Sequence, residues 1–260
     1  MHPGEHEVMA RVEAQHWWYR GLRDALARSL QQKPLGLKPH PRVLDAGCGT
    51  GENLRFLGEL LQPAYLGGFD SSEEALRLAR RKTTSADLYL GDICDPVVRT
   101  GDIDLLISLD VIYIPGVERA MNGLRRLTSA MADGGLLVLN LPAYNWLYSD
   151  HDVAIHTSQR FTVPEVRTLL RTLGLSVERL TYRLFFLFPA VVLARLPSIL
   201  RARPGDVLAR SDLHSVPGER INRTLLQILR AENAMIARGV RLPWGSSVFA
   251  IGRKGEAKNR

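Results

Sequence analysis

The sequence predicts an α/β fold in which a mostly parallel sheet is covered by helices on both faces. From residue 42 onward, apolar strand-like segments alternate with helix-like segments, and this alternation is typical of a parallel sheet. A glycine-rich turn follows the first strand, and aspartates stand at the ends of several strands. Together these observations favour a ligand site at the carboxyl ends of the strands.

Length and composition fit one large domain, or one domain with a lid. The 260 residues are 45% hydrophobic and 23% charged, which excludes disordered, collagen-like and coiled-coil proteins. Two cysteines, Cys48 and Cys94, are too few for a disulfide framework or a thiolate zinc site. With no signal-peptide pattern in the first residues, the sequence predicts a cytoplasmic protein.

The net charge of +7 would suit a polyanionic partner such as RNA. The positive charges are scattered, however, and several lie in residues 195–210 and 254–260. Charge alone is weak support for nucleic-acid binding. We therefore expect a basic enzyme ahead of a nucleic-acid binder.

An amphipathic helix is predicted ahead of the sheet, because apolar residues recur at helical spacing between Met9 and Leu30. A proline-punctuated linker follows at 33–41. The next strands are predicted at 42–47, 64–70, 86–92, 102–110 and 134–142. The helices between them are predicted at 52–61, 71–82 and 116–131.

The pattern changes after residue 141. Residues 142–162 form a long loop rich in aromatic, His and Asp residues, and loops of that length are commonly functional. A helix is predicted at 163–174, between Thr162 as N-cap and Gly174. Strands at 175–183 and 246–254 complete the sheet.

Too many residues separate these last two strands for a hairpin, so Leu184–Trp244 is predicted to form an inserted helical cap. Its apolar run, Leu184–Leu200, has 17 residues and contains Arg195 and two prolines. A membrane-spanning helix needs about 20 apolar residues. We expect a buried or membrane-touching lid and no transmembrane span.

The segment VLDAGCGTG places Gly47, Gly49 and Gly51 between a strand and a helix. Glycines there allow a tight turn and the close approach of a ligand to the backbone, beside the positive end of a helix dipole. Glu52 stands where a dinucleotide fingerprint has glycine. An acid there would repel a pyrophosphate, which disfavours NAD.

Four aspartates lie at the ends of predicted strands. They are Asp45, Asp70, Asp92 and Asp110. Asp70 follows Gly51 by 19 residues, a place from which a carboxylate can accept hydrogen bonds from both ribose hydroxyls. Each acid alone could be a helix or turn cap. Four acids in register with a glycine loop favour a nucleotide-like ligand.

On these motifs the chain resembles class I S-adenosylmethionine-dependent methyltransferases. The resemblance rests on VLDAGCGTG, on FD at Asp70, on GDI at Asp92 and on SLDVIY at Asp110. It extends to a bacterial small-molecule methyltransferase-like branch through HWWYR, PAYNWLYSDHD, LFFLFPAVVLARL and LPWGSSVFAIGRK. It implies a Rossmann-like fold with a seven-stranded, mostly parallel sheet. The implied cofactor is S-adenosyl-L-methionine, with S-adenosyl-L-homocysteine as product.

The resemblance also implies a domain plan. Residues 1–40 would form a helix closing on the cofactor, and 41–183 the cofactor-binding core. Residues 184–244 would form the cap over the acceptor site, 245–254 the last strand and 255–260 a flexible tail. Cofactor contacts are implied for Tyr19, Arg23, Asp45, Gly47, Gly49, Gly51, Asp70, Asp92, Ile93, Leu109 and Asp110.

Among these, Asp70 would hold the ribose diol, Asp92 the adenine amino group with Ile93 against the ring, and Leu109 and Asp110 would lie beside the methionine ammonium. Tyr19 and Arg23 would approach the cofactor's carboxylate. The substrate pocket is predicted to contain Trp17, Trp18, Tyr144 and Trp146. Trp17 and Trp18 could equally pack the N-terminal helix onto the sheet.

Candidate catalytic residues are Tyr113, His151 and His156, which could take a proton from the acceptor. Many relatives carry histidine where this chain has Ile114, so base catalysis from that loop is in doubt. A loop histidine such as His156 could also be structural. Only Asp152 and His156 have helical metal-ligand spacing, and we expect no metal.

Three functions remain open from the sequence. The first is methyl transfer to a small, fairly apolar molecule, such as a natural-product or lipid-linked intermediate. The second is tRNA or rRNA methylation, although Asn140–Ala143 is only weakly similar to a base-methylating signature. The third is a catalytically silent protein that binds the cofactor.

Overall fold

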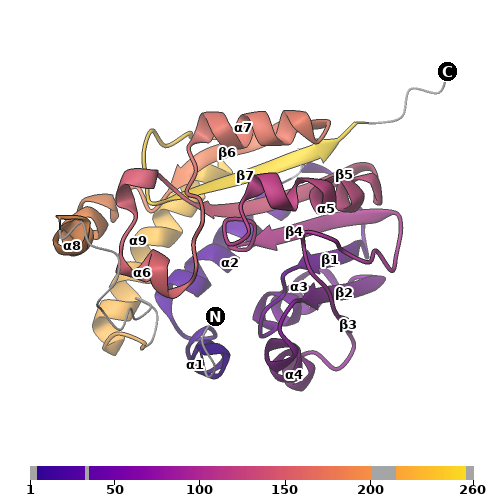
Figure 1. Ribbon diagram of the computed structural model, residues 1–260, viewed down its shortest axis with the longest axis horizontal. Helices are drawn as coiled ribbons and strands as arrows, with labels where there is room; N and C mark the ends of the chain where they lie inside the picture. Colours follow the sequence, from indigo (N-terminus) through magenta and orange to yellow (C-terminus); the bar gives the residue numbers. More distant parts are fainter. Residues whose placement is uncertain (1–4, 33–34, 201–214, 256–260) are drawn as a thin grey trace.

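The computed structural model describes residues 5–32, 35–200 and 215–255. Its centre is a seven-stranded sheet in the order β3-β2-β1-β4-β5-β7-β6 (Figure 1). All neighbouring strands are parallel except β7, which runs antiparallel to β5 and β6. The strands are β1 (Arg42–Ala46), β2 (Tyr65–Asp70), β3 (Asp87–Leu90), β4 (Ile103–Leu109), β5 (Met131–Pro142), β6 (Leu175–Arg183) and β7 (Ser247–Lys254). The predicted Rossmann-like, mostly parallel sheet of seven strands is confirmed.

Helices cover both faces of the sheet (Figure 1). On one face α5 (Val117–Ser129) and α7 (Val163–Thr172) bury Leu124 and Leu170. On the other, α2 (Trp17–Leu30), α3 (Glu52–Leu61) and α4 (Glu73–Lys82) bury a second layer. The central strand β4 is buried along its whole length, as its unbroken apolar sequence predicts for a strand covered on both sides.

The predicted ends of α7 agree with the structure. The backbone N–H of Thr162 donates to Oε2 of Glu165 over 2.6 Å, which forms a capping box at the start. Gly174 follows the helix with a φ of 73°, a left-handed conformation that favours glycine.

The N-terminal segment differs from the single helix that its apolar spacing predicts. It forms two helices, α1 (Glu5–Val12) and α2, separated by a turn at residues 13–16. His16 has extended backbone angles, and its Nδ1 accepts a hydrogen bond from the N–H of Trp18 over 3.2 Å, capping α2. The apolar spacing between Met9 and Leu30 runs across the turn, so periodicity alone does not reveal the break.

The segment between β6 and β7 contains two described helices, α8 (Phe188–Leu200) and α9 (Glu219–Ala237). Helix α9 lies along α2, where Nδ2 of Asn233 donates to the carbonyl of Gly21 over 2.8 Å. A Cβ on Gly21 would lie 2.3 Å from Cδ1 of Leu229, so glycine permits this close helix crossing.

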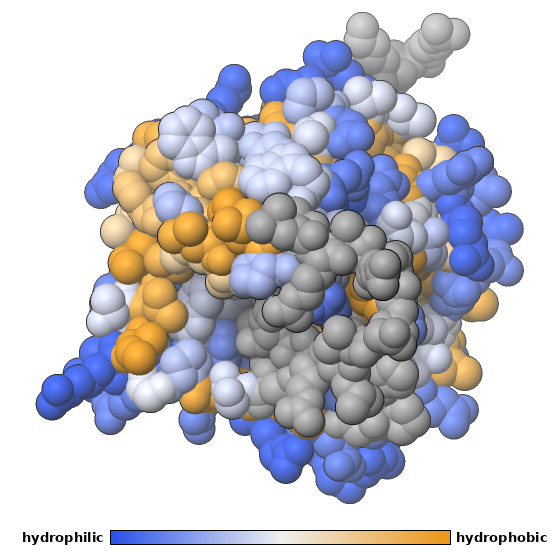
Figure 2. Space-filling view, turned by 60° about the vertical axis from the view of Figure 1, so that its left-hand side comes forward, coloured by the Kyte–Doolittle hydropathy of each residue, from blue (hydrophilic) through white to orange (hydrophobic). Residues whose placement is uncertain are grey.

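Helix α8 presents apolar side chains to solvent, including Leu193 and Leu196, and Figure 2 shows apolar surface gathered on this side of the molecule. In the described part of the chain no helix is both long and apolar enough to cross a membrane. The long loop before α7 contains two short helices, η2 (Asn145–Leu147) and α6 (Asp150–Ala154).

Candidate active site

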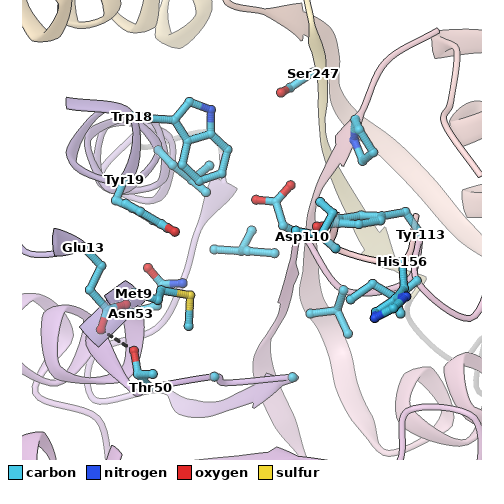
Figure 3. Close-up of a pocket in the computed structure, with 18 of the residues that line it drawn as sticks. Met9, Glu13, Trp18, Tyr19, Thr50, Asn53, Asp110, Tyr113, His156 and Ser247 are labelled. Atoms are coloured by element: carbon cyan, nitrogen blue, oxygen red, sulfur yellow. Dashed lines mark hydrogen bonds between the residues drawn. The ribbon is translucent and has the colours of Figure 1, made fainter. Parts of the chain in front are cut away.

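A cavity of about 1200 Å³ opens at the carboxyl ends of β1, β2 and β4 (Figure 3). Pockets that hold one drug-sized ligand measure about 300–1000 Å³. Its wall runs from α1, α2 and the glycine loop at one end to the 142–162 loop and α8 at the other. The volume is therefore larger than one such ligand requires.

The glycine loop forms one end of the cavity. Gly47, Gly49 and Gly51 have φ values of 88°, 53° and 85°, which favour glycine. A Cβ on Gly47 would lie 2.4 Å from Cγ2 of Val111, and one on Gly51 would lie 2.9 Å from Cα of Ala79. Gly47 and Gly49 line the cavity, whereas Gly51 lies behind it as the first turn of α3 begins.

The carboxylate of Asp70 is fixed beside this loop. Its Oδ2 accepts from the N–H of Gly49 over 2.8 Å, and its Oδ1 accepts from the N–H of Ser72 over 2.9 Å. Asp70 lines the cavity. A carboxylate held by two backbone amides keeps free lone pairs for a ligand hydroxyl.

Asp45 lies behind the loop and is outside the cavity lining. It is only 1% exposed, and its Oδ2 has no hydrogen-bond partner. Burial, with the nearby charge of Asp70, raises the pKa of Asp45 to about 8. A polar atom this deeply buried without a hydrogen-bond partner is unusual.

Asp92 and Ile93 follow β3 and line the cavity, as does Leu109 at the end of β4. Oδ1 of Asp92 accepts from the N–H of Cys94 over 2.8 Å, which holds the turn after β3. The structure therefore brings the predicted adenine-side residues to the same cavity as Asp70.

Asp110 points into the middle of the cavity (Figure 3). Its φ of 60° is in the left-handed region, and such strain is common at ligand sites. Both of its carboxylate oxygens accept from Nδ2 of Asn140, over 2.9 and 3.0 Å. Burial raises the pKa of Asp110 to about 7, although Asn140 and the charge of Arg183 oppose the shift.

Helix α2 supplies Trp17, Trp18 and Tyr19 to the wall, and Figure 3 shows Trp18 and Tyr19 across the cavity from Asp110. Arg23 is placed differently from the expectation. It is buried outside the cavity lining, and its Nη2 donates to the carbonyl of Glu13 over 2.7 Å. Arg23 fastens the turn between α1 and α2 because its position in α2 faces inward, away from the cavity.

Glu13 and His16 line the cavity, and sequence reasoning missed both. Glu13 accepts hydrogen bonds from Oγ1 of Thr50 and Nζ of Lys82, which tie the N-terminal turn to the glycine loop and to α4. Burial lowers the pKa of His16 to about 4. The sequence signal for His16 is its place in the HWWYR motif, from which only the aromatic residues were predicted to line the pocket.

At the other end of the cavity, Tyr113 and His156 line the wall (Figure 3). The carbonyl of Tyr113 accepts from the N–H of Ser158 over 2.9 Å, which joins the loop after β4 to the 142–162 loop. Burial raises the pKa of Tyr113 well above its usual value, so its phenol is protonated at neutral pH. His151 lies in α6, but its side chain is outside the described part of the structure.

The carboxylate of Asp152 forms ion pairs with two arginines. Both of its oxygens lie 2.7 Å from Nη1 of buried Arg160, and Nη1 of Arg195 lies 3.6 Å from Oδ2. These groups line the acceptor end of the cavity. Across the described residues, no group of three or more His, Cys, Asp or Glu side chains could hold a metal ion.

Tyr144 and Trp146 do not line the cavity, contrary to the predicted pocket. Their rings stack on each other with centroids 5.7 Å apart, and Tyr144 also stacks on Tyr182 at 5.1 Å. Phe188 of α8 completes this aromatic cluster, 5.9 Å from Tyr144. The aromatic composition of the loop predicted pocket residues here. In the structure these two rings instead pack the loop against β6 and α8.

Residues 43–135 match a family described as "Methyltransferase domain". Over 158 residues the chain is 32% identical to a trans-aconitate 2-methyltransferase of Deinococcus radiodurans, covering 60% of this chain and 56% of that protein. It is 33% identical over 156 residues to the biotin biosynthesis bifunctional protein BioCD of Bordetella avium, covering 60% of this chain and 33% of that protein. The chain thus spans about half or less of the length of these curated relatives.

Solved structures show the same fold. A putative methyltransferase of Haloferax volcanii, in complex with the Trm112 methyltransferase activator, has a TM-score of 0.61 at 19% identity over 99% of this chain and 96% of its own. The plantazolicin methyltransferase BpumL, solved with S-adenosylhomocysteine (SAH), has a TM-score of 0.60 at 15% identity over 98% and 91%. Residues 43–135 therefore form a methyltransferase domain, and the sheet order is that of the fold shared with these solved methyltransferases.

Proposed function

We propose that the protein transfers a methyl group from S-adenosylmethionine to a small molecule bound at the opposite end of the cavity. One observation carries the proposal. The glycine loop and three strand-end aspartates, Asp70, Asp92 and Asp110, share a single cavity with a second wall made by Tyr113, His156, Ile114 and α8. In that arrangement the cofactor and the methyl acceptor would bind next to each other.

The residues at the loop end fit the cofactor. Gly47 and Gly49 leave no room for a Cβ beside Val111 and Met9, so the bare backbone of the loop faces the cavity. Asp70 would hold the ribose hydroxyls, Asp92 would face the adenine amino group, and Asp110 would face the ammonium group. Glu13 would close this end from the N-terminal turn.

When bound, the cofactor would supply a methyl group on a cationic sulfur, and its neutral thioether product would be a good leaving group. The chain mainly has to align the acceptor and exclude water, and such alignment is worth about 7–11 kcal/mol. Protonated Tyr113 would donate a hydrogen bond and would not act as a base. Since Nδ1 of His16 accepts from Trp18, its proton is on Nε2, and it too would donate.

A small and fairly apolar acceptor is supported by the wall that faces it. Ile114, Pro115, Ile155, Val191 and Ala194 supply apolar surface, and the Asp152–Arg160 pair supplies a placed polar group. Apolar clefts with a few fixed polar groups are typical of small-molecule sites. The relatives named as trans-aconitate 2-methyltransferases support a small-molecule acceptor as well. A natural-product or lipid-linked intermediate fits this description.

Cofactor binding is tested by calorimetric titration of the protein with SAH, S-adenosylmethionine and NAD. We expect the first two to bind with a dissociation constant of about 10 μM or tighter, or about −7 kcal/mol, and NAD to bind far more weakly. Failure of SAH to bind, or equal binding of NAD, would contradict the proposal.

A further inference from the structure

A continuous set of polar side chains runs inward from Asp110. Asp110 accepts from Nδ2 of Asn140, and Oδ1 of Asn140 accepts from Nη1 of Arg183 over 3.1 Å. Arg183 ends β6 and is 0% exposed. An amide between a carboxylate and a guanidinium transmits the orientation of both, because its donor and acceptor ends are fixed by opposite partners.

Arg183 forms no direct ion pair with another described residue, although the charge of Glu232 on α9 supports it. Its Nε and Nη2 have no hydrogen-bond partner, and its Cζ lies 5.9 Å from the ring centroid of Phe249. Burying a charge in this way costs free energy unless another group gains from it. Two acids oppose this cost most: Glu232, and Asp110 at the other end of the Asn140 bridge, facing the cavity.

Glu232 on α9 lies near Arg183, but its carboxylate accepts hydrogen bonds from backbone N–H groups. Its two oxygens accept from the N–H groups of Leu184 and Phe185, each over 2.7 Å. Glu232 thereby orders the chain directly after Arg183, while the hydrogen bond of the guanidinium goes to Asn140.

We propose that Arg183 is a positioning residue that acts through Asn140 to keep the Asp110 carboxylate ionised and aimed at the cofactor's ammonium group. This inference rests on the function proposed above. The charge of Arg183 opposes the rise that burial causes in the pKa of Asp110. Without that charge, Asp110 would be neutral over more of the physiological pH range and would attract a cation less strongly.

Other groups also act on Asp110 or Arg183. Those that face them from the surrounding elements are Tyr19 and Asp24 on α2, Tyr113 after β4, and Glu232 on α9. Asp45, with a pKa of about 8, also titrates near the cofactor end. The experiment must therefore isolate the contribution that passes through Asp110.

Two measurements do so. The first is a ¹³C-carboxyl NMR titration of Asp110 in the free protein, assigned with Asp110→Asn. The second is the pH dependence of SAH affinity by calorimetry. In the wild type we expect affinity to fall as pH falls through about 7, because Asp110 gains a proton. Arg183→Met is expected to raise both midpoints by about one pH unit and to weaken SAH binding at pH 7 about fivefold.

Arg179→Met is the matched control. Arg179 lies on the same strand, but its guanidinium donates to the carbonyl of Ala237 at the end of α9 and makes no bond to Asn140. It should leave both midpoints unchanged. Arg183→Lys keeps the positive charge, so both of its midpoints should lie close to those of the wild type. In an Asp110→Asn background, Arg183→Met should have no further effect on the pH profile.

Unchanged midpoints in Arg183→Met would overturn the inference. If Arg183→Met does not fold, Asn140→Thr breaks the bridge at its middle and should shift the midpoints in the same direction; no shift there would also overturn it. If wild-type protein does not bind SAH at any pH, the proposed function fails. The NMR midpoint of Asp110 then still decides the role of Arg183.

Discussion

The backbone N–H of Gly49 donates to Oδ2 of Asp70 over 2.8 Å, across the gap between the β1 loop and the end of β2. The loop thereby fixes the carboxylate, and the carboxylate holds the loop in its positive-φ conformation. Two motifs that lie apart in the sequence form one unit at the mouth of the cavity.

Asp70→Ala should weaken binding of SAH by about 1.5–3 kcal/mol, because charge-assisted hydrogen bonds to the ribose are lost. Calorimetry measures this, with Asp87→Ala at the exposed start of β3 as the control. Thermal unfolding of both variants separates the loss of hydrogen bonds to the ribose, which leaves Tm unchanged, from a destabilised glycine loop, which lowers Tm. Equal SAH affinity in Asp70→Ala and the wild type would contradict the assignment to the ribose.

Asp45→Asn should stabilise the protein most at alkaline pH. Burial raises the pKa of Asp45 from 3.8 to about 8. Between these values the folded protein keeps a proton that the unfolded chain has lost, so its contribution to stability falls as pH rises through this range. The Tm difference between variant and wild type should therefore increase from pH 6 to pH 8.5. A difference that does not change with pH would show that Asp45 is ionised in the fold.

Arg160→Met should destabilise the fold by about 3–5 kcal/mol, because it removes the buried guanidinium whose Nη1 donates to both oxygens of Asp152 and leaves only Arg195, at 3.6 Å, to oppose that charge. Chemical denaturation measures the change. Arg126→Met is the control, since the Arg126–Asp95 pair is largely exposed and such pairs contribute about 0–1 kcal/mol. Similar losses in both variants would refute a structural role for the buried pair.

SAH should slow hydrogen exchange in α1. Met9 of α1 lines the cavity, with its Cε 3.2 Å from a Cβ built on Gly49, and Glu13 joins the same segment to Thr50 and Lys82. A ligand beneath these residues should oppose local opening. Backbone amides of α7, which lies outside the cavity lining, serve as the control. Unchanged exchange in α1 would contradict the proposal that residues 1–40 close on the cofactor.

Much of the sheet was predictable because its signals are local. Each parallel strand is an apolar run, and Asp70, Asp92 and Asp110 mark the strand ends that meet at the cavity. The capping box at Thr162 and Glu165 likewise lies within four residues.

The rest depends on contacts that no local pattern specifies. Arg23 turns to the carbonyl of Glu13 because the chain breaks at residues 13–16. Tyr144 stacks on Tyr182, which lies on β6. The Asn140–Arg183 bridge joins residues 43 apart in sequence. A polar residue within the apolar strand at 134–142 was the available signal for Asn140, but its partner could come only from the fold.

The central claim, methyl transfer to a small molecule, is tested most directly with S-adenosylmethionine carrying a tritiated methyl group. The wild type and Asp70→Ala are incubated with cell extract that has been separated into small-molecule, RNA and protein fractions. We expect wild-type-dependent label in the small-molecule fraction and a strong reduction with Asp70→Ala. Label in the RNA or protein fraction, or no transferred label from wild-type protein that binds SAH, would contradict this account.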